Sequence, residues 1–202
     1  MENQDKKKGI IIEAALKRFA HYGLSKTTMT EIAKDVSFSK ALLYYYFPDK
    51  LSLYVSTIEY LMQLISRDLV KSIDKTSTST EGIFKLLQKR QHFIQKYYTL
   101  LESTHVIGTE LPDDLYEKFN KARAFETIII GSLFTRGIAS GELAMDDAKL
   151  TTEIFLDCLS GIHFNIMSKD KHIFPEKEQF KKIFLKEKVF AEIFLQGLKP
   201  QA

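Results

Sequence analysis

The sequence has little of what a secreted or membrane-spanning protein needs. It contains one cysteine, Cys158, so no internal disulfide can form, and this usage is typical of the reducing cytoplasm. Its most apolar stretch, residues 128–134, is far shorter than the ~20 residues that cross a bilayer. Charged side chains interrupt the apolar residues near the N-terminus, which argues against a signal peptide. We therefore expect a cytoplasmic protein that has no membrane partner.

Motifs of catalysis and metal binding are missing as well. The sequence has no nucleophile motif, no phosphate-binding glycine loop and no dinucleotide fingerprint. Glu102 and His105 have the E-x-x-H spacing of a di-metal helical bundle, but such a site needs a second copy and further carboxylates. His21, His163 and His172 have no metal-binding spacing. We expect no enzyme activity, no metal and no cofactor, although an enzyme is the main alternative class.

The net charge is only +3, which by itself does not indicate a nucleic-acid partner. Residues 1–50 hold nine basic and six acidic residues, whereas the rest of the chain holds 20 of each, so the whole excess lies at the N-terminal end. This asymmetry is compatible with a polyanion partner or with ordinary solvation. A non-specific nucleoid-type DNA binder, which is a further alternative, should carry a much larger charge.

Strand signals are almost absent, and apolar residues recur at spacings of three and four, so the sequence predicts an all-α fold. The polar run at residues 74–80 is the clearest linker. The predicted helices are approximately residues 7–22, 28–36, 40–47, 50–71, 81–102, 113–140, 146–169 and 176–198. Breaks between the later helices are predicted at 108–112 and 169–175.

Local capping signals delimit the first helices. Gly23 can close the first helix in a left-handed conformation, and residues 28–31, TMTE, form a capping box that starts the second. Ser39 can cap the third helix and Asp49 the fourth. Two short helices joined by a tight turn and braced by a third are typical of a helix-turn-helix, which lays its second helix in the major groove of DNA. We therefore predict a DNA-binding domain over residues 1–49 and a larger helical domain over 50–202.

The proposed reader helix, residues 40–47, has two different faces. At 100° per residue, Leu43 and Phe47 point inward. The outward or flanking residues are Lys40, Ala41, Leu42, Tyr44, Tyr45 and Tyr46. The alternative is that the three tyrosines only fill a core, but three consecutive helical residues cannot all face one core. A DNA surface accounts for the exposed residues, because hydroxyls and lysines bond phosphates while small or methyl-bearing side chains approach bases.

Residues 11–54 carry a specific set of motifs. These are A-x-x-x-F at residues 15–19, the following glycine, TT at 27–28, IA at 32–33 and S-K-x-x-L-Y-x-Y-F-x-x-K at 39–50. Together they resemble the N-terminal domain of the TetR (tetracycline repressor) family of bacterial regulators. The segment RGIASGEL, residues 136–143, also resembles the end of that family's seventh helix.

The resemblance implies DNA contacts at defined positions. The residues implied to contact phosphates are Thr28, Tyr44, Tyr46 and Lys50. Those placed in or beside the groove are Thr30, Ser39, Lys40, Ala41, Leu42 and Tyr45. Two departures matter: Ser37 replaces the usual turn glycine, so it is expected in a left-handed conformation, and Leu42 replaces a common threonine or serine, which suggests contact with a thymine methyl.

A single reader helix covers too few base pairs for useful specificity, so such proteins normally bind as two-fold dimers. The last two helices carry more large apolar side chains than one face needs, and the resemblance implies a four-helix bundle across the dimer axis. The residues expected at this homodimer interface are Ile154, Cys158, Gly161, Ile162, Phe184, Phe190 and Phe194. The alternative is that all of them pack inside one subunit.

The middle helices combine aromatic with polar side chains, and the resemblance implies an effector pocket among them. The polar candidates are His92, Tyr97, His105 and Arg123. Each aromatic residue taken singly also fits an ordinary core. The resemblance implies a sequence-specific transcriptional regulator, a repressor that a small apolar or aromatic effector releases from its double-stranded operator by favouring a conformation that DNA rejects.

Overall fold

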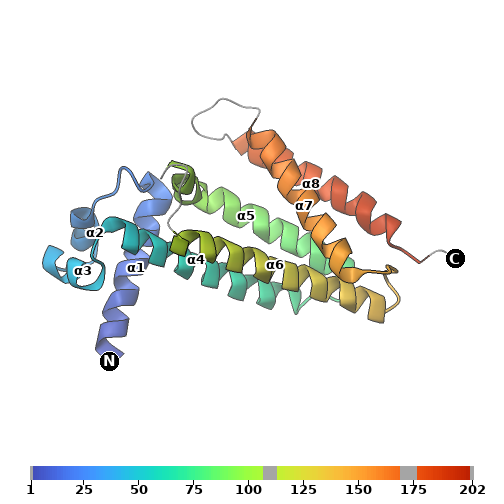
Figure 1. Ribbon diagram of the computed structural model, residues 1–202, viewed down its shortest axis with the longest axis horizontal. Coiled ribbons are helices and arrows are strands. Elements are labelled where there is room, and N and C mark those ends of the chain that lie inside the picture. Colours follow the sequence, from blue (N-terminus) through green and yellow to red (C-terminus); the bar gives the residue numbers. More distant parts are fainter. Residues whose placement is uncertain (1, 107–112, 169–176, 201–202) are drawn as a thin grey trace. The chain divides into compact units, whose positions relative to one another are not determined.

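The computed structural model describes residues 2–106, 113–168 and 177–200, and in these ranges every regular element is a helix (Figure 1). The helices are α1 (Glu2–Tyr22), α2 (Met29–Asp35), α3 (Lys40–Tyr46), α4 (Lys50–Ile73), α5 (Ser79–Val106), α6 (Asp113–Ala139), α7 (Ala148–Met167) and α8 (Lys177–Gly197). The predicted all-α fold class is thus confirmed. The breaks predicted at 108–112 and 169–175 lie outside the described residues.

Two helices extend beyond the ranges predicted from the sequence. Helix α1 begins at Glu2 rather than at Lys7, because residues 2–8 contain no proline or glycine and are rich in good helix formers. Helix α5 continues to Val106, with non-helical backbone angles inside it at Tyr97 (φ −112°, ψ 15°). Propensity alone does not locate such ends, since tertiary contacts decide them.

The chain forms two compact units. The first unit comprises residues 1–66 and 96–122, and the second comprises 67–95 and 123–202. Helices α4, α5 and α6 each contribute residues to both units. The beginning of α4 therefore groups with the three N-terminal helices, and the domain boundary expected after residue 49 stays a prediction.

The core of the first unit anchors α3 against α1 and α2. The fully or almost fully buried apolar residues of these helices and the turn after α3 are Ile11, Ala15, Leu16, Phe19, Met29, Ile32, Ala33, Leu43 and Phe47. On α1, Ile11 is fully buried and Ile12 is only partly buried. Tyr54 on α4 packs edge-on against Phe19, with 5.3 Å between ring centroids, and its hydroxyl donates to the Leu100 carbonyl (2.5 Å).

The second unit has an aromatic core and a buried ion-pair centre. Phe134 and Phe155 are fully buried, and Phe190 and Phe194 of α8 stack against Phe155 with ring centroids 5.4 and 5.2 Å away. Helices α7 and α8 pack against each other (Figure 1). The ion-pair centre consists of Arg90, Glu126 and Glu187, contributed by α5, α6 and α8. Because Phe190 and Phe194 pack on Phe155, part of the apolar surface of α8 is buried inside the subunit.

The turn between α2 and α3 contains a strained residue. Ser37 has φ 55°, the left-handed conformation expected where the TetR pattern has glycine. Because a Cβ disfavours this region, we expect Ser37→Gly to raise the free energy of unfolding by roughly 0.5–1 kcal/mol, after the added flexibility of the unfolded chain is counted. Urea unfolding should show no such gain for Ser37→Ala, which keeps the Cβ. A loss of stability in Ser37→Gly would instead indicate that the serine hydroxyl stabilises the turn.

Candidate nucleic-acid interface

The capping box at the start of α2 is present as the sequence predicts. The Thr28 hydroxyl accepts a hydrogen bond from the Glu31 amide (3.2 Å), and the backbone and hydroxyl of Thr28 donate to Glu31 Oε2 at 2.9 and 2.7 Å. These bonds from Thr28 lower the pKa of the Glu31 carboxyl below its usual range. The cap satisfies amides that α2 would otherwise leave without partners, so it fixes where this short helix begins.

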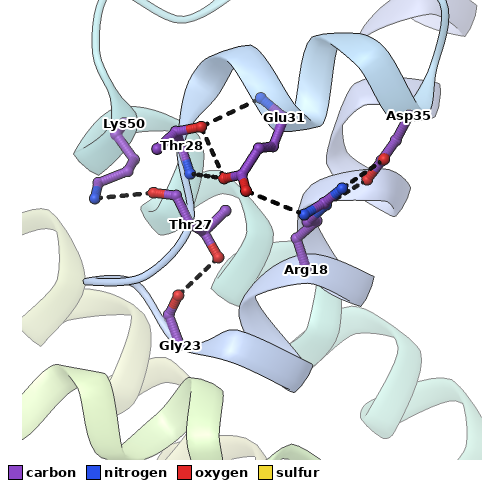
Figure 2. A network of polar contacts seen from close by, with 7 residues as sticks. All are labelled: Arg18, Gly23, Thr27, Thr28, Glu31, Asp35 and Lys50. Atoms are coloured by element: carbon purple, nitrogen blue, oxygen red, sulfur yellow. Dashed lines mark hydrogen bonds and ion pairs between the residues drawn. The ribbon is translucent and has the colours of Figure 1, made fainter.

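Arg18 links α1 to both ends of α2 (Figure 2). Its guanidinium donates through Nε and Nη2 to the two carboxylate oxygens of Asp35, at 2.6 and 2.8 Å, and Nη1 lies 3.5 Å from Glu31. The hydrogen bond from Arg18 lowers the pKa of the Asp35 carboxyl. A bidentate pair of this kind fixes orientation as well as distance, so α2 is held in register on α1. Sequence reasoning missed this pair, because its residues lie on different helices with no local pattern.

Lys50 lies at the start of α4, beside the loop that precedes α2 (Figure 2). Its ammonium donates to the carbonyls of Leu24 (2.8 Å) and Thr27 (3.1 Å), while the Thr27 hydroxyl donates to the Gly23 carbonyl (2.8 Å). Gly23 itself has φ 77°, as its predicted capping role requires. Lys50 thus ties the loop to α4, and an ammonium has one further N–H for a phosphate. The phosphate contact implied for Lys50 stays a prediction.

Helix α3 is capped and anchored as the sequence predicts. Ser39 accepts a hydrogen bond from the Leu42 amide (3.1 Å). Leu43 is fully buried and Phe47 is 2% exposed, whereas Tyr44 and Tyr45 are 43% and 68% exposed. The other predicted DNA-contacting residues divide into exposed Thr28, Thr30, Ser39, Lys40 and Ala41 and partly buried Leu42, Tyr46 and Lys50.

The exposed face of α3 combines cations with aromatic hydroxyls. The Lys40 ammonium lies 5.7 Å from the centroid of the Tyr44 ring, and the Tyr45 and Tyr46 rings meet edge-on with centroids 5.2 Å apart. These contacts limit the freedom of long side chains before any partner arrives. The face therefore presents hydrogen-bond donors without acidic neighbours from α3 itself, which suits an anionic partner.

Comparison with known proteins identifies this helical unit. Residues 11–57 match the model of the bacterial regulatory proteins of the tetR family. Residues 11–57 therefore form a domain of the tetR family of bacterial regulatory proteins. The match covers the capping box, the whole of α3 and the first turns of α4, which are the elements from which the sequence resemblance was drawn.

Relatives of this chain include the HTH-type transcriptional regulator YuxN of Bacillus subtilis, 33% identical over 112 residues, which are 53% of this chain and 35% of YuxN. The chain spans about a third of the length of the first curated relatives that it matches. A crystal structure of a transcriptional regulator from Cytophaga hutchinsonii is 27% identical, with a TM-score of 0.88 over 96% of this chain and 99% of that one. The Bacillus subtilis transcriptional regulator FadR, solved in complex with stearoyl-CoA, shares the fold at 19% identity, with a TM-score of 0.67 over 94% and 98% of the two chains.

The four effector candidates do not share one environment. Tyr97 is buried in the first unit, whereas His92 is exposed in the second. Arg123 is also exposed in the second unit, where it pairs with Asp157 at 2.8 Å. The side chain of His105, like that of Glu102, lies outside the described residues. Their effector role therefore stays a prediction.

A cavity of about 400 Å³ lies elsewhere in the first unit. Residues of α4 and α6 line it: Leu51, Ser52, Val55, Ser56, Glu59, Glu117 and Lys118. Lys118 and Glu59 form an ion pair at 2.8 Å beside it.

Among the side chains that the structure describes, none forms a group of three or more histidines, cysteines and acids placed to hold a metal ion. No helix in the described ranges combines the length and apolar character needed to cross a membrane.

The expected dimer residues fall into two groups. Ile154 and Gly161 on α7 are exposed. The partly buried ones are Cys158, Ile162, Phe184, Phe190 and Phe194. Exposed apolar residues that were not among those expected also lie on these helices: Leu150, Phe164, Leu185, Val189 and Ile193. The sequence showed an excess of large apolar side chains on these helices, but it did not show which face of each helix remains exposed.

Proposed function

We propose that this chain is a sequence-specific DNA-binding transcriptional regulator, a repressor that a small molecule releases from its operator. One observation carries the proposal: the capped helix α3 is anchored by Leu43 and Phe47 and leaves Lys40, Tyr44 and Tyr45 exposed. A helix held in this way can enter a major groove without unfolding its own domain. The family assignment points to the same binding role and gives no support to catalysis.

The contacts divide by chemistry. The hydroxyls of Tyr44 and Tyr46 contact phosphates, as do Lys50 and Thr28 near the helix ends. The residues that lie in or beside the groove are Thr30 of α2 and Ser39, Lys40, Ala41, Leu42 and Tyr45. Leu42 is partly buried beside the fixed Leu43, so its methyl groups can approach a thymine methyl only from a defined direction. Thr28 already donates its amide and hydroxyl to Glu31, so a phosphate there must share or displace that carboxylate.

The regulator acts as a homodimer in this proposal. Exposed apolar residues recur at a spacing of four on α8, at Leu185, Val189 and Ile193, and α7 exposes Leu150, Ile154 and Phe164. Exposed apolar residues on two helices that pack against each other are typical of an interface. A second copy of the chain that covers it with the same helices forms a four-helix bundle and supplies the second reader helix.

The effector in this proposal is a small molecule with an apolar or aromatic part. Support comes from the family fold, since FadR with the same fold was solved with stearoyl-CoA bound. His92, Tyr97, His105 and Arg123 stay the candidate polar contacts. A ligand releases the operator only if it binds the DNA-incompetent conformation more tightly than the DNA-competent one.

Selection of bound duplexes from a random-sequence pool, followed by titration of α3 variants, tests the DNA-binding proposal. We expect Tyr44→Phe to weaken binding to matched and mismatched duplexes alike by about 1 kcal/mol, because it removes one phosphate hydrogen bond. Lys40→Ala and Leu42→Ala should lose about 1–3 kcal/mol on the selected sequence and less on mismatched ones. Tyr44 is preferred to Lys50 for this test, because Lys50 also fixes a loop.

Equal losses on every sequence for Lys40→Ala and Leu42→Ala would contradict the assignment of base contacts. If the pool yields no enriched sequence, and random competitor DNA removes the protein equally well at every salt concentration, the proposal of a specific regulator is wrong.

A further inference from the structure

We propose that the first turns of α1 extend the DNA interface of α3, with Lys7 and Lys8 contacting phosphates that flank the groove which α3 enters. This inference rests on the proposed DNA-binding function and adds a second element to it. Neither lysine was among the DNA-contacting residues predicted from the sequence. Two contacts and the geometry of α1 support it.

The start of α1 lies beside the exposed face of α3. Gln4 Nε2 donates to the Tyr45 hydroxyl at 3.2 Å, although the two residues are 41 positions apart. Tyr45 is the most exposed tyrosine of α3. Because its oxygen accepts the bond from Gln4, its own hydrogen remains available to donate to a phosphate or a base. Gln4 thus positions a hydroxyl that the DNA interface uses.

Lys8 reaches the other end of α3. Its ammonium lies 5.7 Å from the centroid of the Phe47 ring, and Phe47 is the C-terminal cap of α3. Phe47 is buried while Lys8 is exposed, so the aliphatic part of the lysine crosses the edge of the domain core and its charge stays in solvent. Gln4 and Lys8 therefore border the same helix that carries Lys40 and Tyr44.

Helical geometry divides the lysine run KKK into two faces. At about 100° per residue, Lys7 and Lys8 lie within about 60° of the direction of Gln4, whereas Lys6 lies about 160° away from it. Asp5 lies about 100° away, so its charge is to the side of this face. Ile11 and Ala15, which are fully buried, continue the face that carries Gln4, Lys7 and Lys8. Lys7 and Lys8 thus lie on the face of α1 that Gln4 and Lys8 turn toward α3, and Lys6 lies on the opposite face.

The occupant that fits this surface is the phosphate backbone of the same duplex. The surface is cationic, continuous with the exposed residues of α3 and built on a helix that Arg18 fixes to α2. Lysines placed beside a groove-entering helix add affinity without reading bases, because they neutralise phosphates and release counterions.

Matched single-charge variants test the inference in the full-length protein. With a duplex recovered from the random-pool selection, we expect Lys8→Ala to lower the steepness of the dependence of log K on log salt by about 0.9, which corresponds to about an eight-fold loss of affinity at 0.1 M salt. Lys7→Ala should behave alike. Lys6→Ala removes the same charge from the opposite face and should leave the slope unchanged, and Lys8→Arg should retain it.

Equal changes in slope for Lys6→Ala and Lys8→Ala, or an unchanged slope for Lys8→Ala, overturn the inference while sequence-specific binding by the unmodified protein persists. If the unmodified protein itself shows no preference for a selected duplex, the proposed function fails, and this inference with it. A double-mutant cycle tests Gln4 separately: Gln4→Ala should weaken binding in the unmodified chain and have no effect beside Tyr45→Phe. Thermal unfolding of each variant checks that Phe47 remains packed.

Discussion

Arg90→Ala is expected to lower the free energy of unfolding by about 3–5 kcal/mol, because it leaves a buried carboxylate without its counter-charge. Glu187 is 1% exposed, and its Oε1 lies 2.5 Å from Arg90 Nη1. Arg90 Nε also lies 3.0 Å from Glu126, which is partly exposed. The penalty arises at Glu187, since Glu126 can still be solvated. Urea unfolding of the second unit measures this loss in the free energy of unfolding.

The loss of stability should depend on pH with a definite sign. Burial raises the pKa of the Glu187 carboxyl, and the charge and hydrogen bond of Arg90 oppose this rise. Without Arg90 the pKa rises further, so the folded protein binds a proton more tightly than the unfolded chain does. The penalty is therefore full above the raised pKa of the folded state, fades as the pH falls from that value towards the ordinary value of 4.5, and is absent below it.

A double variant separates the charge effect from the loss of packing. Arg90→Met with Glu187→Met removes both charges and retains side-chain volume, so we expect it to recover most of the stability that Arg90→Ala loses. A double variant as unstable as the single one, with no dependence on pH, would show that the penalty does not arise from an uncompensated charge on Glu187.

The geometry of α3, which carries the proposed DNA-binding surface, could be predicted from the sequence because its determinants are local. The capping box at residues 28–31, the N-cap Ser39 and the spacing of Leu43 and Phe47 are all read within one or two helical turns. The left-handed turn followed from a single departure, serine at position 37 where the family has glycine. Each signal fixes a backbone direction, and together they set which residues of α3 remain exposed.

Polar contacts between distant segments could not be predicted in this way. Arg18 with Asp35, Gln4 with Tyr45 and Arg90 with Glu187 join different helices, and no periodicity records which charged residue meets which. The role of Phe190 and Phe194 was also open. Periodicity showed an excess of apolar residues on α8, but only packing shows that these two stack on Phe155 within the subunit.

The exposed stripes of α7 and α8 give the second large expected effect. Phe164 and Ile193 are 73% and 69% exposed, so we expect Phe164→Glu and Ile193→Glu to leave the monomer folded. If a second copy covers these residues, each substitution places an unpaired charge in an apolar interface and should convert the dimer to a monomer. Loss of the second reader helix should then weaken operator binding by at least ~100-fold, or about 2.7 kcal/mol.

Sedimentation velocity and operator titration together check this expectation. Val70→Glu is the matched control, because it also replaces an exposed apolar residue with glutamate but lies on α4. On a duplex that contains a single half-site, the monomeric variants and the unmodified protein should bind alike, since only one reader helix is used. Variants that remain dimeric would show that α7 and α8 do not join the two subunits and that the reader helices are paired through another surface. Variants that lose the half-site as well would show that the weaker operator binding does not come from loss of the second reader helix.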